Sequence, residues 1–443
     1  EKQLLRSTLS DDSGNLIILY GRRRIGKSTL LNEIISKKDV YFLADMRETP
    51  LQIRELQKQI SEKYKDFANI IIPNWDALFT TLKNFIRNPF TLVMDEFPYL
   101  VKNAPELPSI IQKEIDMGNL SGINLILCGS SQSMMANLFD SAKSPLYGRA
   151  SSIIKLGYLS VFHLQKLLNI SAEKAVEEYS IWGGVPRYWV ERTKYNSLFK
   201  AAEYLVLSKY SLFYDEPIIL FLDEMRTSMQ SNSILSLVGN GVNKLSEIAG
   251  RLSKPATNLS KPLQLLIELN YLKREVPFGE KEKNAKRSLY KIADPFLNFY
   301  FRFVVPHRSL IELGLNEMVM KKIKSEWNRY VSAAYEDLCR LSIPFLLKRK
   351  GNFIPAKRYW NKYTEIDIIS IDADNNIYVV GEVKWNDRIK LNTVMDSLDK
   401  KITKIPFLKE AKIIKVIFGK KHIQKGGVLY FSAEDVVNAL KDI

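Results

Sequence analysis

The chain has 443 residues, 46% of them hydrophobic and 26% charged. This length exceeds one ordinary hydrophobic core and predicts several domains, while the apolar content is that of a globular protein. The formal net charge of +16 favours a polyanionic partner, nucleic acid before membrane. The longest apolar runs are far shorter than a membrane span, and no signal-peptide pattern opens the chain, so we expect a soluble cytoplasmic protein.

Residues that bind transition metals are few and scattered. The two cysteines, Cys128 and Cys339, lie in apolar or helical surroundings, which argues against a disulfide framework or a cysteine-based zinc site. The three histidines, His163, His307 and His422, form no cluster in the sequence, and we interpret each as structural.

The first predicted strand, Leu16–Tyr20, leads into "GRRRIGKST" and then a predicted helix over 28–35. This is the G-x-x-x-x-G-K-[S/T] pattern in the strand-to-helix context it requires. Backbone N–H groups and the helix N-terminus would surround phosphate oxygens, Lys27 would reach the β- and γ-phosphates, and Ser28 would bind Mg²⁺. The predicted nucleotide-binding loop comprises Gly21, Arg22, Arg23, Arg24, Ile25, Gly26, Lys27, Ser28 and Thr29. The arginines can equally be solvated loop residues.

A second predicted strand, in "FTLVMDEFPYL" from Phe90, ends in two adjacent acids. We expect Asp95 to hold Mg²⁺ and Glu96 to polarise the attacking water as catalytic base. A third strand, in "INLILCGSSQSMM", ends at Ser130, whose hydroxyl is placed to sense the γ-phosphate. Two serines at a strand end are common, so this last signal is weak by itself.

These motifs, followed by "SPLYGRASSIIKL" and "WGGVPRYW", resemble in their order the AAA+ superfamily, and within it the archaeal-type ATPases of the STAND group. The resemblance implies that Arg149 faces a phosphate. It also implies that Pro186, in the Gly-Gly-Val-Pro turn of a small helical lid, packs near the nucleotide. Arg149 can instead belong to a structural ion pair, and the turn can be only a turn.

The middle of the chain has the pattern of a winged helix. We expect a first helix over 244–252 and a recognition helix over 256–269, with a wing in "FGEKEKNAKRS" and a β-prone stretch over Leu289–Ile292. Four polar residues of the recognition helix are candidates for DNA contacts: Asn258, Ser260, Lys261 and Gln264. Winged helices also serve as protein-contact modules, and the sequence leaves both uses open.

A hairpin is predicted in "YTEIDIISIDADNNIYVVGEVKW". If Asp372 faces Ile377 across the turn, the register sets Asp367 opposite Glu382, and their Cβ atoms lie about 5 Å apart. Lys384 then points to the same face. Two carboxylates this close repel unless a cation lies between them, so a Mg²⁺ held by Asp367 and Glu382, with Lys384 assisting catalysis, is the predicted use.

Asp followed by Glu-x-Lys on the adjacent strand resembles the PD-(D/E)xK, restriction-endonuclease-like nucleases. Glu336 matches the acid that this family carries upstream of its hairpin. The leading motif "EID" lacks the proline of the family name, and such domains often lose activity. A salt-bridged surface hairpin is the structural alternative. The C-terminal pattern also resembles the extension found in the same archaeal ATPase family.

Together these motifs predict an α/β fold with four parts. They are a P-loop parallel-sheet ATPase core over 1–157, a helical lid over 158–230, a winged helix over 231–306 and a restriction-endonuclease-like domain over 307–443. The predicted cofactors are ATP and Mg²⁺, and the predicted partners are ATP or ADP and DNA. We expect an ATPase whose nucleotide state controls a Mg²⁺-dependent nuclease-like domain; the alternative is a non-nucleolytic switch binding DNA or a protein. Self-association stays open.

Overall fold

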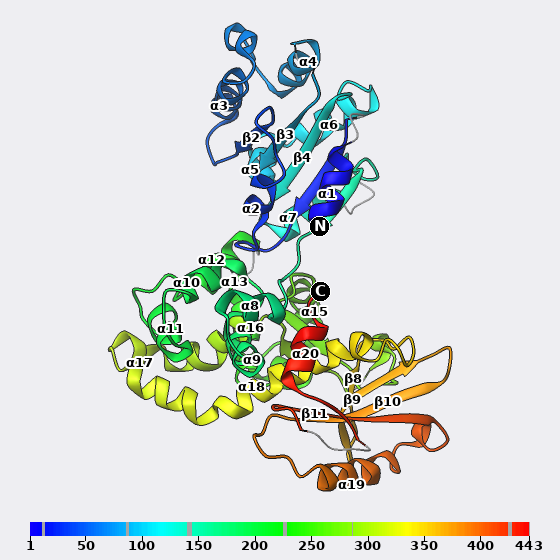
Figure 1. Cartoon of the computed structure of the whole chain (residues 1–443). Coiled ribbons are helices and arrows are strands. Elements are labelled where there is room, and N and C mark those ends of the chain that lie inside the picture. The colour runs from blue at the N-terminus through cyan, green and yellow to red at the C-terminus, as the bar shows by residue number, and fades with distance from the viewer. Residues whose placement is uncertain are drawn as a thin grey trace. The chain divides into compact units, whose positions relative to one another are not determined.

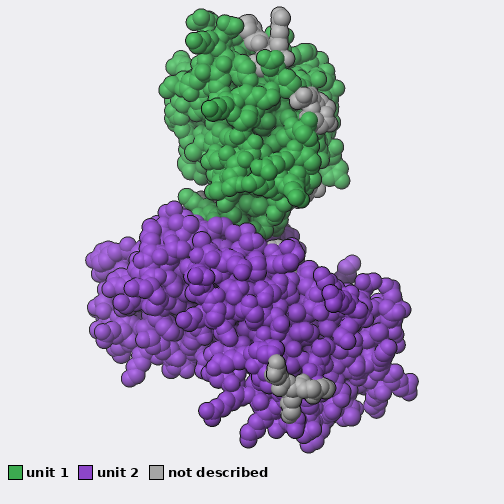
Figure 2. All heavy atoms as spheres, in the orientation of Figure 1, with its two compact units in different colours: residues 1–157 green, residues 158–443 purple. Residues whose placement is uncertain are grey.

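A computed structural model describes residues 1–10, 14–85, 88–139, 144–224, 228–285, 287–423 and 428–442 (Figure 1). The chain divides into two compact units, Glu1–Gly157 and Tyr158–Ile443, which Figure 2 colours separately. Within these described ranges, no helix is both long enough and apolar enough to cross a membrane.

The first unit is built on a five-stranded sheet in the order β2-β3-β4-β1-β5. The strands are β1 (Leu16–Tyr20), β2 (Val40–Leu43), β3 (Phe90–Asp95), β4 (Ile123–Gly129) and β5 (Ser152–Lys155). Every neighbouring pair is parallel. The carboxyl ends of the strands therefore meet at one edge of the sheet, and this edge carries Gly21, Glu96 and Ser130. The prediction of an α/β fold with a P-loop parallel sheet is confirmed.

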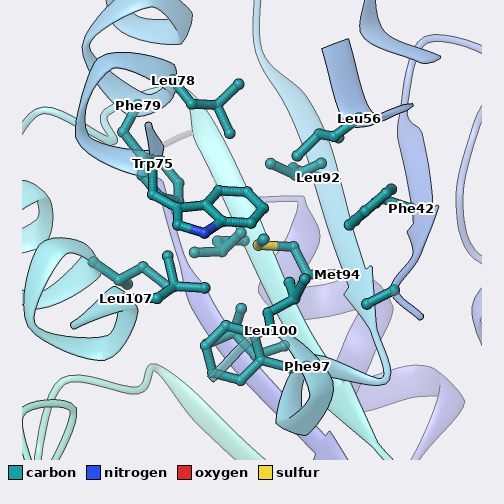
Figure 3. Close-up of a cluster of buried hydrophobic side chains, with 14 of the residues drawn as sticks. Phe42, Leu56, Trp75, Leu78, Phe79, Leu92, Met94, Phe97, Leu100 and Leu107 are labelled. Carbon is teal, nitrogen blue, oxygen red and sulfur yellow. The ribbon is translucent and has the colours of Figure 1, made fainter. Parts of the chain in front are cut away.

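Helices cover both faces of this sheet. They are α1 (Lys2–Leu9), α2 (Lys27–Asn32), α3 (Thr49–Ser61), α4 (Trp75–Phe85), α5 (Phe97–Asn103), α6 (Leu107–Asp116) and α7 (Gln132–Phe139). In β1, Ile17 packs with Leu5 of α1 and Leu31 of α2, whereas Ile18 packs in the larger cluster on the other face. Figure 3 shows that larger cluster, where Trp75 of α4 lies over the strand residues Leu92 and Met94. Because both faces are covered, these strands are continuously apolar.

The second unit begins with helices α8 (Val161–Leu168), α9 (Ala172–Trp182), α10 (Pro186–Arg192), α11 (Leu198–Leu205), α12 (Glu216–Glu224) and α13 (Ser228–Gly239). Ser171 caps α9 by accepting a hydrogen bond from the backbone N–H of Lys174. A buried ion pair between Glu178 of α9 and Arg192 of α10 fixes these two helices together.

A short helix pair and a hairpin follow in the chain. They are α14 (Leu245–Arg251), the 3₁₀ turn η2 (Ala256–Leu259), α15 (Ser260–Glu268), and the antiparallel strands β6 (Leu272–Glu275) and β7 (Leu289–Ile292). The order helix, helix, hairpin is the one predicted. The winged-helix function attached to it stays a prediction.

The C-terminal sheet is mixed, with the order β12-β11-β10-β9-β8. Its strands are β8 (Lys357–Trp360), β9 (Glu365–Asp372), β10 (Ile377–Lys384), β11 (Lys412–Gly419) and β12 (Leu429–Phe431). The strands β8, β9 and β10 are antiparallel neighbours, and β10, β11 and β12 are parallel ones. On one face, Leu398 and Ile402 of α19 (Leu391–Ile402) pack against strand residues such as Ile369.

The long helix α18 (Asn316–Leu346) joins the helical part of the second unit to this sheet. Tyr330 donates a hydrogen bond to the carbonyl of Ser180 in α9 (2.9 Å), and Tyr335 donates one to the carbonyl of Gly419 in β11 (2.9 Å). One helix thus contacts both parts, which explains why residues 158–443 form a single compact unit. The predicted boundaries within it stay predictions.

Candidate functional sites

The loop between β1 and α2 has the backbone geometry that its glycines permit. Gly26 caps α2 with a left-handed conformation (φ 99°), and a Cβ on Gly21 would lie 2.8 Å from the carbonyl oxygen of Leu156. Other residues would be strained at the first position and would clash at the second. Arg22 and Ile25 are buried, whereas Arg23, Ser28 and Thr29 are exposed. Contacts of the arginines with a nucleotide stay a prediction.

Lys27 is buried at the start of α2, and its ammonium is held against this loop. Its Nζ donates to the carbonyls of Gly21 (2.9 Å) and Arg22 (3.3 Å). A buried ammonium beside backbone N–H groups and a helix N-terminus is suited to bind an anionic phosphate.

Asp95, at the end of β3, is buried and receives hydrogen bonds from two hydroxyls. Its Oδ2 accepts from Ser28 Oγ (3.1 Å) and from Tyr41, and its Oδ1 accepts from the backbone N–H of Glu96 (2.9 Å). Ser28 and Asp95 lie 67 residues apart in the chain, yet they meet here as two oxygen donors of the kind that Mg²⁺ prefers. These residues fit a Mg²⁺–nucleotide complex.

Tyr41 is a site residue that the sequence did not single out. It lies on β2, and burial followed by its hydrogen bond to Asp95 raises the pKa of its hydroxyl, which therefore stays protonated as a donor. No motif marks a tyrosine at this position. The parallel pairing of β2 with β3 brings it to Asp95.

Glu96 is held by the strand next to its own. It adopts a left-handed conformation (φ 54°), and its Oε2 accepts hydrogen bonds from the backbone N–H (3.2 Å) and Oγ (2.9 Å) of Ser130. The structure thus brings Ser130 to Glu96, because β3 and β4 end side by side. The predicted roles of Glu96 as base and Ser130 as phosphate sensor stay predictions.

Arg149 does not lie beside the phosphate loop of its own chain, and its predicted contact with a phosphate stays a prediction. Its guanidinium forms a double hydrogen bond with Asp116 at the end of α6, both distances 2.8 Å. It precedes β5, whose first residue Ser152 pairs with Ile17 near the start of β1. Arg149 thus lies at the amino edge of the sheet, whereas the loop follows the carboxyl edge. The distance along β1 from Ile17 to Gly21 is about 13 Å, because a strand rises about 3.3 Å per residue.

The Gly-Gly-Val-Pro turn precedes α10 in the second unit, where Pro186 is half-buried at the first position of the helix. A Cβ on Gly184 would lie 2.3 Å from the carbonyl oxygen of Leu159, so close packing requires this glycine. The turn therefore has a structural reason of its own. A contact between Pro186 and the nucleotide stays a prediction.

The second candidate site lies on the hairpin of β9 and β10, which has the predicted register. Ile377 pairs with Asp372, and the ladder continues to Gly381 opposite Ile368, one residue before Asp367 and Glu382. Lys384 Nζ lies 2.8 Å from Glu382 Oε2 and 3.9 Å from Asp367 Oδ2. These three side chains therefore share one face of the hairpin.

Glu336 joins this cluster from α18. Arg340, one helical turn further on, donates to Glu336 Oε2 (2.8 Å) and to the backbone carbonyl of Asp367 (2.9 Å). Burial, and then the negative charge of Asp367, raise the pKa of the Glu336 carboxyl above its ordinary value. Residues from a helix and two strands thus form one acidic cluster.

Lys401 of α19 also belongs to this cluster and was missed by sequence reasoning. Its Nζ lies 2.7 Å from Glu382 Oε1, so each carboxylate oxygen of Glu382 contacts a lysine. The acids Glu336, Asp367 and Glu382 are thereby balanced by as many cations, namely Arg340, Lys384 and Lys401. Across the described part of the chain, no group of three or more His, Cys, Asp or Glu is arranged to hold a metal ion. As arranged, the hairpin does not fit Mg²⁺.

The predicted DNA-contacting residues of α15 and the turn before it lie on an exposed surface. Asn258, Ser260, Lys261 and Gln264 are exposed, whereas Leu259 and Leu263 between them are buried. In the predicted wing, Lys281 and Lys283 are exposed and Arg287 bonds Glu280 and the Trp360 carbonyl. Lys286, a further wing residue of the prediction, lies outside the described residues. This exposure is compatible with DNA contact or protein contact.

Comparison with known proteins identifies the family. A family model described as "ATPase domain predominantly from Archaea" matches residues 2–191. A second, described as "Archaea bacterial proteins of unknown function", matches residues 300–401. An uncharacterized protein of Methanocaldococcus jannaschii is 30% identical over 448 residues, which cover 98% of each chain. The chain belongs to this archaeal ATPase family. The resemblance to archaeal-type ATPases predicted from the motifs is confirmed.

In this archaeal ATPase, the matched ATPase range extends beyond the first compact unit and includes Pro186, and the second range includes the whole acidic cluster. A Walker-type ATPase of Pyrococcus abyssi shares the fold, with a TM-score of 0.51 and 22% identity over 68% of this chain and 94% of that one. The ORC2 protein of Aeropyrum pernix has a TM-score of 0.46 and 14% identity, with 71% and 93% of the two chains covered.

Proposed function

We propose that this protein binds ATP at the loop Gly21–Thr29 and hydrolyses it with the acids that follow β3. The observation that carries this proposal is the meeting of Ser28, Asp95 and Glu96 beside a buried Lys27 at one edge of a parallel sheet. We place this activity in the cytoplasm.

In this proposal, each residue of the ATP site has a distinct role. The loop backbone and Lys27 hold the phosphates, while Ser28 and Asp95 hold Mg²⁺, which when bound neutralises charge on the phosphate oxygens. Tyr41 orients Asp95 by its hydrogen bond. Glu96, oriented by Ser130 through Oε2, accepts a proton from the attacking water.

The test separates binding from turnover. Glu96→Gln keeps the size of the side chain and can still accept from Ser130, but the amide cannot act as a base. We expect ATP affinity within twofold of the parent and hydrolysis slower by about 100-fold, the usual share of a general base. Hydrolysis at the parental rate would remove Glu96 from the mechanism.

For the C-terminal domain, two candidate functions follow from different observations. The residue types of Glu336, Asp367, Glu382 and Lys384 favour a Mg²⁺-dependent nuclease whose action depends on the ATP state. The contacts of Lys384 and Lys401 with both oxygens of Glu382 favour a non-nucleolytic switch, in which this fold docks DNA or a protein partner. Because the cluster is already charge-balanced, the geometry supports the switch better.

Cleavage of DNA by the purified protein decides between these two candidates. For the switch, we expect no nicking of supercoiled plasmid in Mg²⁺ or Mn²⁺, with or without ATP. Cleavage that EDTA abolishes, and that Lys384→Ala loses while DNA binding is retained, would instead establish the nuclease.

We also propose that the protein associates with DNA through α15 and the wing-like loop. Replacing the exposed Lys281 and Lys283 with alanine should weaken duplex binding and reduce the slope of log affinity against log salt by about 0.9 for each lost phosphate contact. An unchanged slope would assign this surface to protein contacts.

A further inference from the structure

A charged pocket of about 340 Å³ lies within the second unit, between β6, α18 and β8. This volume is within the range of small-ligand sites. Five cationic side chains line it against three acidic ones, and two of the cations, Arg340 and Arg358, also pair with Glu336 and Glu365 outside the lining. The cations are Lys273, Arg274, Arg340, Lys357 and Arg358, and the acids are Glu275, Glu282 and Asp337.

The acids of the pocket differ in how firmly they are held. The Asp337 carboxylate accepts hydrogen bonds from Lys273 (2.6 Å) and Arg340 (2.8 Å). Burial by itself would raise the pKa of Asp337, but the positive charges of Lys273 and Arg340 outweigh it and lower the pKa to about 2. Glu282 contacts Lys357 at 3.1 Å, but its side chain is 73% exposed. Exposed ion pairs contribute little to stability, so Glu282 can give way to a competing anion.

The cationic wall suits a phosphate. Three of its five cations are arginines, whose planar guanidinium groups bind phosphate oxygens in pairs. Trp360 also lines the pocket, and the guanidinium of Arg358 lies 5.3 Å from its ring centroid. An aromatic side chain beside arginines is the combination on which nucleic acid bases stack.

We propose that this pocket binds a phosphate-bearing nucleotide unit, either free or within a single nucleic acid strand, whose phosphate takes the place of the Glu282 carboxylate at Lys357 and competes with Glu365 for Arg358. This site is separate from the ATP loop, and its binding requires neither ATP hydrolysis nor cleavage by the hairpin.

The pocket also shares a residue with the acidic cluster. Arg340 lines the pocket and at the same time bonds Glu336 and the backbone of Asp367. A ligand phosphate that attracts Arg340 would weaken its hold on Glu336. Ligand binding in the pocket would therefore change the contacts of the acidic cluster through Arg340.

The test uses the full chain and two probes. A fluorescent, 5′-phosphorylated single-stranded hexanucleotide is titrated by anisotropy, and thymidine monophosphate is titrated by calorimetry, both in a Lys27→Ala background so that the ATP loop does not contribute. The double variant Lys357→Ala, Arg358→Ala should weaken binding by about tenfold or more, because charge-assisted hydrogen bonds are lost. A matched control, Lys348→Ala, Arg349→Ala, removes the same residue types from an exposed stretch outside the lining and should change binding less than twofold.

A second variant decides the matter if the double variant does not fold. Glu282→Gln removes only the exposed competing carboxylate and should strengthen binding by roughly twofold to fivefold. Weakening of both probes by the double variant would indicate a free nucleotide ligand, and weakening of the hexanucleotide alone would indicate a strand. Equal losses in the pocket variant and its control, or unchanged binding in Glu282→Gln when the double variant fails to fold, would overturn the proposal.

Discussion

The ATP site and the hairpin cluster both bring carboxylates and a lysine close together, yet the hydrogen-bond partners of their carboxylates differ. Asp95 accepts from the hydroxyls of Ser28 and Tyr41, whereas Glu382 contacts the ammonium groups of Lys384 and Lys401. A hydroxyl donor leaves the negative charge in place, but an ammonium cancels it. The first arrangement therefore still attracts a divalent cation, and the second already holds its counter-charges.

The largest expected effect comes from removing the lysine of the ATP loop. Lys27→Ala should weaken ATP binding by about 100-fold, because it removes a charge-assisted contact with the phosphates. Calorimetric titration with ATP and Mg²⁺ measures this change. Lys37→Ala removes the same charge from an exposed position and should bind ATP like the parent. Parental affinity in Lys27→Ala, in protein that unfolds at the parental temperature, would contradict the assignment of the loop.

Removing a lysine from the hairpin cluster should have the opposite sign. Lys401→Ala exposes one oxygen of Glu382 and leaves the cluster with an excess negative charge, so Mn²⁺ should bind at least about tenfold more tightly. The measurement is calorimetry with Mn²⁺ in the absence of nucleotide. Lys400→Ala, one residue earlier on the same helix and exposed, is the control. If Lys401→Ala and its control bind Mn²⁺ alike, charge balance does not explain the difference between the two sites.

A smaller effect should follow from removing one hydroxyl that holds Asp95. Tyr41→Phe keeps the ring on β2 and loses only the hydrogen bond, so we expect the kcat for ATP hydrolysis to fall on the order of fivefold with KM nearly unchanged. Tyr64→Phe is a matched control, because its hydroxyl bonds only the Lys38 carbonyl among the contacts observed. A purely structural Tyr41 would instead lower the unfolding temperature and leave kcat unaltered.

The smallest expected effect concerns Asp337, an acid of the pocket that bonds Lys273 and Arg340. Because Lys273 and Arg340 lower its pKa from 3.8 to about 2, its contribution to stability is present above about pH 4 and is lost as the pH falls toward 2. Asp337→Asn should therefore be less stable than the parent at pH 6, and this gap should narrow near pH 2.5. Urea unfolding at both values measures it, and a constant gap would mean that the charge of Asp337 is not involved.

The sequence by itself determined the elements whose signal is local. The apolar runs of β1, β3 and β4 predicted a parallel sheet, and the glycines around Lys27 predicted the turn from strand to helix. The turn residues 373–376 predicted the register of β9 with β10, which places Asp367 and Glu382 on one face. These features follow from neighbouring residues, because alternation, glycine conformation and turn length are properties of short segments.

The tertiary structure alone decided which distant side chains meet these elements. Tyr41 reaches Asp95 because β2 pairs with β3, Lys401 reaches Glu382 because α19 packs on the sheet, and Arg149 lies at the opposite edge from the loop because parallel strands separate their two ends. No short-range pattern marks these positions. Each contact joins segments far apart in the chain, and their packing sets which charges are balanced by hydroxyls and which by lysines.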